Sequence, residues 1–356
     1  MNAQLTDPVA GDHIDLDRPV HDRIHLESLP GAVDRLLQQC QDIGAPLLTG
    51  IRRVADSVVA DCAGPLREVA GLRLFSALSV VIGPDRDGDA ADAVAALRHS
   101  REDGVLSALS DRPAFRVDPI GDRWQLRDTI EADLGWANDP ADWQVNLTRR
   151  GELLLGQVGA LHYGRRFPAL ARIPASTTPL VAAVMLALAK VRAGNVVYDP
   201  FCGAGTLLVE TAAQAALARV LGSDHERRAL TAAAQNRPLV PGAFLARADA
   251  AALPVATDSI DRIVSNLPFG KRVGSHAANE VLYPAFLREL DRVLRLDGRA
   301  VLLTEDKQLF RRSVEATPRI RLVREVPLAT GGLHPTAYVL ERTRAAQRSN
   351  RRAGKR

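Results

Sequence analysis

Two segments of this sequence carry residue types at spacings that could do chemistry, and the first is a glycine turn. Asp199 ends an apolar run and is followed closely by Gly203, Gly205 and Thr206. A backbone without Cβ atoms can approach a ligand at unusual φ angles, and the helix expected from Thr206 presents its positive N-terminal end to that ligand. This order of strand, turn and helix predicts a nucleotide-type pocket, with a ligand-free turn as the plain alternative.

The second segment is the loop Asn-Leu-Pro-Phe at residues 266–269, which follows another apolar strand. Pro268 stiffens the loop, so the Asn266 side-chain oxygen and nearby carbonyl groups can point at one spot. Such acceptors orient the lone pair of an exocyclic amine and stabilise the charge that develops on alkylation. Phe269 offers a face on which a base can stack. We assign Asn266, Pro268 and Phe269 to catalysis by positioning and electrostatics; because an amide is no general base, the proton acceptor stays open.

Acidic residues at two more expected strand ends complete the predicted pocket. Asp224 lies 25 residues after Asp199 in the sequence. In dinucleotide-binding folds, a carboxylate roughly 20 residues after the glycine turn accepts from ribose hydroxyls. Asp249 can accept from an adenine amino group, although a helix cap is an alternative role there. Leu208 replaces the third glycine of a dinucleotide-binding pattern, which disfavours pyrophosphate and favours S-adenosylmethionine, with Asp199 facing its ammonium group. The predicted cofactor-binding residues are Asp199, Phe201, Gly203, Gly205, Thr206, Asp224, Asp249, Ala250 and Asn266.

Basic residues beside these segments predict contacts with nucleic acid. Lys271 and Arg272 directly follow the catalytic loop, and Arg165 and Arg166 end the N-terminal part. We assign all four to substrate RNA, where they would contact phosphates without reading sequence. The last fifteen residues hold seven basic and no acidic residues. Residues 343–356 of this stretch form the predicted tail, which is expected to be disordered and either to solubilise the protein or to attract phosphates.

Composition bounds the class of protein. The chain has 356 residues, 46% hydrophobic and 25% charged, with a formal net charge of +4. Its length predicts two domains, and neither a secretory signal nor an apolar run long enough to span a membrane is expected. The three cysteines fit neither a disulfide framework nor a metal site. We therefore expect a cytoplasmic protein, a monomer, with no metal.

Elements that position the motifs can be traced along the chain. Residues 179–342 alternate strands and helices, which predicts a parallel sheet covered by helices, with an antiparallel pair at the end. Residues 71–166 predict a mixed α/β region, with strands at 72–82, 114–117, 143–147 and 152–161 and helices at 89–109 and 124–134. Residues 167–178 form the expected linker. The first 70 residues are a divergent region in which 1–29 is expected to be irregular and 31–51 helical.

Together, residues 199–206, 266–272 and 299–304, and Gly331-Gly332-Leu333 before a strand, resemble the THUMP-domain tRNA guanine-N2 methyltransferases. The resemblance covers residues 167–342 and implies a Rossmann-like class I methyltransferase domain with a seven-stranded sheet. It also implies an α+β ferredoxin-like and THUMP-like domain before it, binding of S-adenosylmethionine and tRNA, and methylation of an acceptor-stem guanosine, at position 6. Residues 115–117 and 143–161 are similar to parts of a THUMP module.

Two other classes remain open from the residues alone. One is a methyltransferase for another planar amine: adenine N6 in ribosomal RNA or DNA, or a protein glutamine amide. The other is an RNA-binding protein that kept the fold without activity. The sequence does not decide which nucleotide is methylated or whether one or two methyl groups are added.

Overall fold

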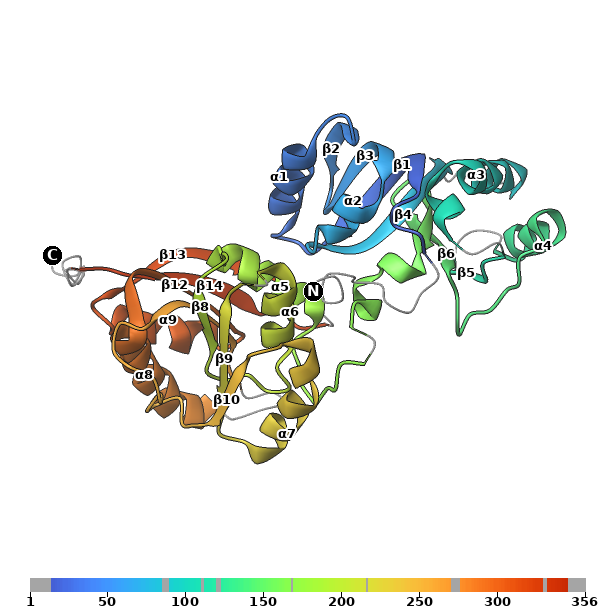
Figure 1. The fold of residues 1–356 in the computed structure, drawn as a ribbon. Coiled ribbons are helices and arrows are strands. Elements are labelled where there is room, and N and C mark those ends of the chain that lie inside the picture. The colour runs from blue at the N-terminus through green and yellow to red at the C-terminus, as the bar shows by residue number, and fades with distance from the viewer. Residues whose placement is uncertain are drawn as a thin grey trace, which may run out of the picture. The chain divides into compact units, whose positions relative to one another are not determined.

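A computed structural model describes residues 14–84, 90–109, 112–119, 123–167, 169–215, 217–269, 276–328 and 332–344. These residues divide into two compact units, with the boundary between residues 168 and 169 (Figure 1). Each unit is built on one seven-stranded sheet.

The sheet of the N-terminal unit has the order β2-β3-β1-β4-β7-β6-β5. Only β5 and β6 pair in parallel; the other neighbours are antiparallel. The strands are β1 Pro19–Ser28, β2 Leu48–Val54, β3 Ser57–Pro65, β4 Phe75–Pro84, β5 Phe115–Val117, β6 Val145–Arg150 and β7 Leu153–Val158. The helices are α1 Val33–Ile43, α2 Arg67–Gly71, α3 Ala90–Glu102 and α4 Arg123–Leu134, with short 3-10 turns η1 Val105–Ala108, η2 Gly159–Leu161 and η3 Tyr163–Arg165.

The first 70 residues differ most from expectation. The predicted irregular stretch contains β1, a central strand that pairs with both β3 and β4. The predicted helix at 31–51 ends at Ile43, and the chain continues into the hairpin of β2 and β3. The strand β1 was missed because charged and histidine residues hide the alternation of apolar and polar side chains in its sequence. Its Ile24 and Leu26 side chains are nevertheless fully buried in the core. Because strands on both sides of residue 70 share this sheet, the expected boundary there lies inside one unit.

The sheet of the C-terminal unit has the order β10-β9-β8-β11-β12-β14-β13. The first five strands are parallel, and β14 lies antiparallel between β12 and β13. The strands are β8 Val196–Asp199, β9 Arg219–Asp224, β10 Phe244–Arg247, β11 Ile260–Asn266, β12 Leu294–Thr304, β13 Ile320–Pro327 and β14 Thr336–Arg342. The predicted parallel sheet with an antiparallel pair at its end is confirmed for this unit.

Helices lie on both faces of this sheet (Figure 1). They are α5 Pro179–Ala189, α6 Thr206–Gln214, α7 Arg227–Gln235, α8 His276–Val293 and α9 Lys307–Glu315, with the short turn η4 Arg237–Leu239. Thr178 caps α5 by accepting a hydrogen bond from the Val181 N–H, and Pro179 occupies the first turn, as expected for a helix start. Almost every side chain of α5 is buried, which explains its uniformly apolar sequence.

Two helices differ from the sequence expectation in this unit. The sequence pattern predicts a helix at residues 283–294, whereas helix α8 begins at His276, ends at Val293 and continues through Pro284. Helix α9 was not predicted, because its nine residues carry several polar and basic side chains beside a narrow buried stripe. Across the described residues, no helix combines the length and apolarity that crossing a membrane requires.

Candidate cofactor and amine-binding site

The predicted site residues converge at the carboxyl ends of β8, β9, β10 and β11. A cavity of about 590 Å³ opens there, as expected for ligand sites of open parallel sheets. Of the predicted cofactor and catalytic residues, all but Gly205 line it. They are Asp199, Phe201, Gly203, Thr206, Asp224, Asp249, Ala250, Asn266, Pro268 and Phe269.

Asp199, the last residue of β8, is a buried carboxylate with one oxygen unused. It is 2% exposed, and its Oδ1 atom accepts from the Ser265 hydroxyl at 2.5 Å and from the Phe201 N–H at 3.1 Å. Its Oδ2 atom has no hydrogen-bond partner among the described residues. Burial raises the pKa of Asp199 to about 7, and the nearby Asp224 charge adds to this. A buried carboxylate oxygen without a donor fits a cationic ligand group.

The glycine turn after β8 adopts backbone angles that favour glycine. Gly203 has φ 54° and Gly205 has φ 84°, both in the left-handed region. Gly205 is the N-terminal cap of α6, so it sets the helix direction without lining the cavity. A Cβ atom on Gly222 of β9 would lie 2.6 Å from the Leu208 side chain. Leu208 therefore packs α6 closely on the sheet, which explains a large apolar residue at that position.

Asp224 holds the glycine turn in addition to lining the cavity. Its Oδ2 atom accepts from the Gly203 N–H and its Oδ1 atom from the Glu226 N–H, both at 2.9 Å. Glu226 is exposed, lines the same cavity, and stands at the N-cap position of α7 without a side-chain capping bond. Its carboxylate lies 3.2 Å from His225. Its place before a helix in the sequence predicts a helix cap, but because its side chain makes no capping bond, Glu226 is a second candidate for the ribose hydroxyls.

Asp249 lies at the third strand end, as predicted, and is exposed at the cavity. Its Oδ1 atom accepts from the Ala251 N–H at 2.9 Å, which shapes the local turn. The neighbouring Ala250 is buried. The carboxylate thus has a structural contact and still faces the cavity, so both of its anticipated roles are compatible with its place.

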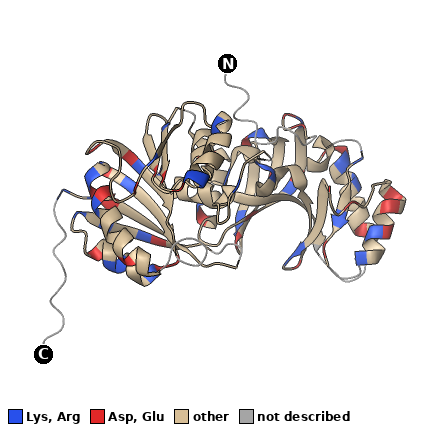
Figure 2. Cartoon of the chain, turned by 90° about the horizontal axis from the view of Figure 1, so that it is seen from below, with Lys and Arg blue, Asp and Glu red and all other residues tan. Residues whose placement is uncertain are grey.

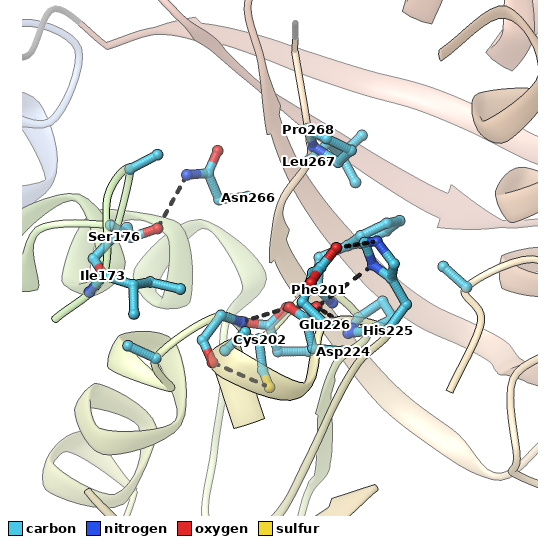
Figure 3. A pocket seen from close by; sticks show the side chains of 18 of the residues that line it. Ile173, Ser176, Phe201, Cys202, Asp224, His225, Glu226, Asn266, Leu267 and Pro268 are labelled. Carbon is cyan, nitrogen blue, oxygen red and sulfur yellow. Dashed lines mark hydrogen bonds and ion pairs between the residues drawn. The ribbon is translucent and has the colours of Figure 1, made fainter. Parts of the chain in front are cut away.

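The Asn266 amide is held by Thr177, which lies in none of the sequence motifs. Its Nδ2 atom donates to the Thr177 hydroxyl at 3.1 Å, and the amide points toward the segment that carries Ser176 (Figure 3). Its Oδ1 atom is buried and has no partner among the described residues. Thr177 therefore fixes which end of the amide stays available: an acceptor, as an amine requires. Thr177 is 89 residues from Asn266 in sequence, and no local pattern links them.

Three buried polar atoms of the cavity residues are without protein partners in the described part of the chain: Asp199 Oδ2, Thr206 Oγ1 and Asn266 Oδ1. Buried polar atoms are nearly always paired in native proteins, so several unpaired ones around one cavity indicate a polar ligand. The first two lie beside the glycine turn, and the third lies at the end of β11. This donor and acceptor set fits a ligand with an ammonium group near β8 and a second amine near β11.

The four predicted RNA contacts have different outcomes. Arg166 is wrong as a surface contact: it is 8% exposed, and its guanidinium donates to the carbonyl groups of Arg73 and Phe75, so it braces β4. Arg165 is partly exposed and donates to the Trp143 carbonyl at 3.0 Å. Lys271 and Arg272, like the tail beyond residue 344, lie outside the described residues. Figure 2 shows basic and acidic residues interspersed in both units.

Residues 170–336 match the family described as RMKL-like, methyltransferase domain. This part, slightly less than half of the chain, is therefore similar to a methyltransferase domain. The tRNA (guanine(6)-N(2))-methyltransferase THUMP3 of Bos taurus is 36% identical over 186 residues, which cover 48% of this chain and 37% of the relative. The tRNA (guanine(6)-N2)-methyltransferase of Thermus thermophilus is 36% identical over 206 residues, 56% of this chain and 60% of that protein. The chain thus spans less than two thirds of the relatives that it matches.

Solved structures extend the similarity beyond the methyltransferase domain. The crystal structure of TrmN from Thermus thermophilus matches with a TM-score of 0.71 and 26% identity, covering 90% of this chain and 99% of that one. Because this coverage exceeds residues 170–336, the N-terminal unit also has counterpart elements in TrmN.

Proposed function

We propose that this protein transfers a methyl group from S-adenosylmethionine to the exocyclic N2 amine of a guanosine in tRNA, in the acceptor stem at position 6. The observation that carries the proposal is the Asn266 amide at the cavity: Thr177 accepts from its Nδ2 atom, and its buried Oδ1 atom has no partner among the described residues. The methyltransferase domain and the names of the relatives support the reaction class and the nucleic acid.

Each end of the cavity serves one reactant. Asp199 receives the ammonium group of S-adenosylmethionine, the turn of Gly203 and Gly205 accommodates its amino-acid portion, and Asp224 with Glu226 accepts from the ribose. Asp249 and the backbone N–H of Ala250 meet the adenine. The bound cofactor supplies an electrophilic methyl group on a sulfonium. This assignment gives a partner to Asp199 Oδ2, which has none among the described residues.

Asn266 and the loop after it act on the amine. The Asn266 oxygen accepts one N–H of the guanine amino group, which directs the nitrogen lone pair and stabilises the charge that grows on nitrogen. Pro268 keeps the loop stiff, and Phe269 offers its ring to the base. Positioning of this kind does not require the Asn266 amide to act as a general base. After the methyl transfer, the amine nitrogen loses one proton to water or to a neighbouring group.

The N-terminal unit, in this proposal, is the ferredoxin-like and THUMP-like part and binds tRNA. The whole sheet of residues 19–158 acts as one unit, which replaces the division at residue 70. Lys271, Arg272 and Arg165 contact phosphates, while Arg166 has a structural role. Three free, buried cysteines agree with a reducing, cytoplasmic compartment; the monomeric state stays a prediction.

The test is nucleoside mass spectrometry of tRNA from cells lacking the gene, beside the same tRNA treated with purified protein and labelled S-adenosylmethionine. We expect N2-methylguanosine to be absent and then restored. A tRNA transcript with inosine in place of the target guanosine is the matched substrate control, because inosine lacks only the N2 amine. Label on that transcript would refute the N2 assignment, and unchanged native tRNA in both arms would refute tRNA as the substrate.

A further inference from the structure

The catalytic loop is fastened to helix α8 by a buried tyrosine that no motif contains. Tyr283 is fully buried, and its hydroxyl donates to the Pro268 carbonyl at 2.6 Å. The same hydroxyl lies 2.8 Å from Thr304 Oγ1, at the end of β12. Thr304 Oγ1 in turn accepts from the Asp306 N–H at 3.0 Å. Three hydrogen bonds therefore run in series from the end of β12 to the loop.

The direction of this series follows from what each group can donate. The Asp306 N–H can only donate and the Pro268 carbonyl can only accept. Tyr283 has one hydroxyl hydrogen, which it donates to the Pro268 carbonyl, so Tyr283 must accept the hydrogen bond between its hydroxyl and that of Thr304. The Thr304 hydroxyl can donate this bond because it acts as the acceptor toward the Asp306 N–H. Every proton in the series is thus assigned, and bonds aligned in this way strengthen one another in a buried setting.

The loop is tied at two consecutive residues as a result. The Leu267 N–H donates to the Leu303 carbonyl of β12 at 2.9 Å, and the Pro268 carbonyl is held by Tyr283. Proline has no N–H of its own, so this carbonyl is the only backbone hydrogen-bonding group through which Pro268 can be fixed. The loop is therefore fixed on both sides of the Leu267–Pro268 bond.

We propose that Tyr283, together with Thr304, is a positioning residue of the amine clamp: it holds the Asn266–Phe269 loop in the orientation that presents the Asn266 oxygen and the Phe269 ring to the target base. The inference rests on the proposed function for its catalytic consequence, but not for its effect on the loop. Tyr283 itself touches neither reactant, since it does not line the cavity.

The experiment compares Tyr283→Phe with Tyr338→Phe in the full-length protein. Tyr338 lies in the same aromatic cluster: Phe310 packs against both rings, with centroids 5.7 Å from Tyr283 and 4.6 Å from Tyr338. Its buried hydroxyl takes no part in the series. Thr304→Val breaks the series one bond earlier, and Thr304→Ser keeps the hydroxyl. The readouts are hydrogen exchange of the peptide containing residues 266–269 without cofactor, affinity for S-adenosylhomocysteine, and kcat and KM on tRNA.

Loss of the hydroxyl in Tyr283→Phe should speed exchange of the loop peptide at least tenfold and lower kcat by about 10- to 100-fold, because small misplacements of reacting groups cost about that much. Affinity for S-adenosylhomocysteine should stay within about threefold. Thr304→Val should have a similar effect, the double variant should be no worse than Tyr283→Phe alone, and Thr304→Ser and Tyr338→Phe should resemble wild type.

Unchanged loop exchange in Tyr283→Phe, or an equal effect in Tyr338→Phe, would overturn the positioning role. A loss of cofactor affinity that matches the loss of kcat would overturn it as well, since the tyrosine would then shape the cofactor site. A wild-type protein without activity on tRNA guanosine would overturn the proposed function, whereas the exchange measurement would still decide the role of Tyr283 in the loop.

Discussion

Replacing Asp199 with Asn tests whether the buried carboxylate is kept for a cationic ligand. Burial raises the pKa of Asp199 from 3.8 to about 7. About three pH units correspond to about 4 kcal/mol between the two protonation states, an upper bound here. Its Oδ1 atom already accepts two hydrogen bonds, so the unused Oδ2 atom is where the cost of the charge is concentrated.

The pH dependence has a definite sign. Because the folded pKa lies above the unfolded value, unfolding releases a proton between about pH 4 and pH 7. The free energy of unfolding of the cofactor-free C-terminal unit should therefore fall as the pH rises through this window and stay level above it. The Asp199→Asn variant has no charge to bury, so it should lose this slope. Relative to wild type it should gain up to about 4 kcal/mol between pH 4 and pH 8.

The assay must report on the C-terminal unit, because all three tryptophans, at 124, 136 and 143, lie in the N-terminal unit. Hydrogen exchange of peptides from β8 and β11 in increasing denaturant, corrected for the intrinsic pH dependence of exchange, serves this purpose. Asp261→Asn is the matched control. Burial acts to raise the Asp261 pKa, but hydrogen bonds from the Val196 N–H and Arg295 lower it overall. Because a lowered pKa stabilises the folded protein above the unfolded pKa, Asp261→Asn should be less stable than wild type at high pH.

Cofactor binding gives the second half of the test. If the ionised carboxylate receives an ammonium group, calorimetry should find wild-type affinity for S-adenosylhomocysteine rising about tenfold per pH unit below pH 7 and levelling above it. Asp199→Asn should bind more weakly, without this slope. A pH slope of stability that persists in the variant would refute the burial argument, and equal affinity at pH 8 would refute the ammonium assignment.

Four further outcomes are expected. Asn266→Ala should lower kcat, measured as methylated tRNA formed, by at least 100-fold, while its calorimetric affinity for S-adenosylhomocysteine stays within about threefold. A normal kcat would remove Asn266 from the mechanism. Thr177→Val should lower kcat about tenfold because the Asn266 amide is no longer held, and Thr177→Ser, which keeps the hydroxyl, should restore kcat. An equal kcat in the two variants would show that the Thr177 hydroxyl does not orient the Asn266 amide. Asp224→Ala should weaken cofactor binding and destabilise the C-terminal unit by about 1–3 kcal/mol, because the Gly203 and Glu226 N–H groups lose their acceptor. Glu226→Ala should weaken cofactor binding without loss of stability, so denaturant titration distinguishes the two variants. RNA affinity should be unchanged in both. Deleting the chain from Arg344 onward should lower RNA affinity and flatten its salt dependence in binding titrations, and an unchanged slope would leave the tail a solubilising end.

The sequence was sufficient to place the strands of the C-terminal unit because their signals are local. Strands of a parallel sheet are buried on both faces, so they appear as apolar runs, and the turns after them are marked by Asp, Gly and Asn. Asp199, Asp224, Asp249 and Asn266 were found in this way, and they all line one cavity. The first 70 residues lacked such signals: β1 carries charged and histidine residues between its buried ones, and its partners β3 and β4 are distant in sequence.

By itself, the sequence determined which side chains stand at the strand ends, because each motif is contained in a few consecutive residues. Only the tertiary structure decided what these side chains contact. It assigned Thr177 to the Asn266 amide and Tyr283 to the Pro268 carbonyl, and it placed Arg166 among backbone carbonyls instead of on the surface. The physical reason is that a hydrogen bond depends on distance and direction between atoms, and the folding of one sheet sets these between residues that no sequence pattern connects.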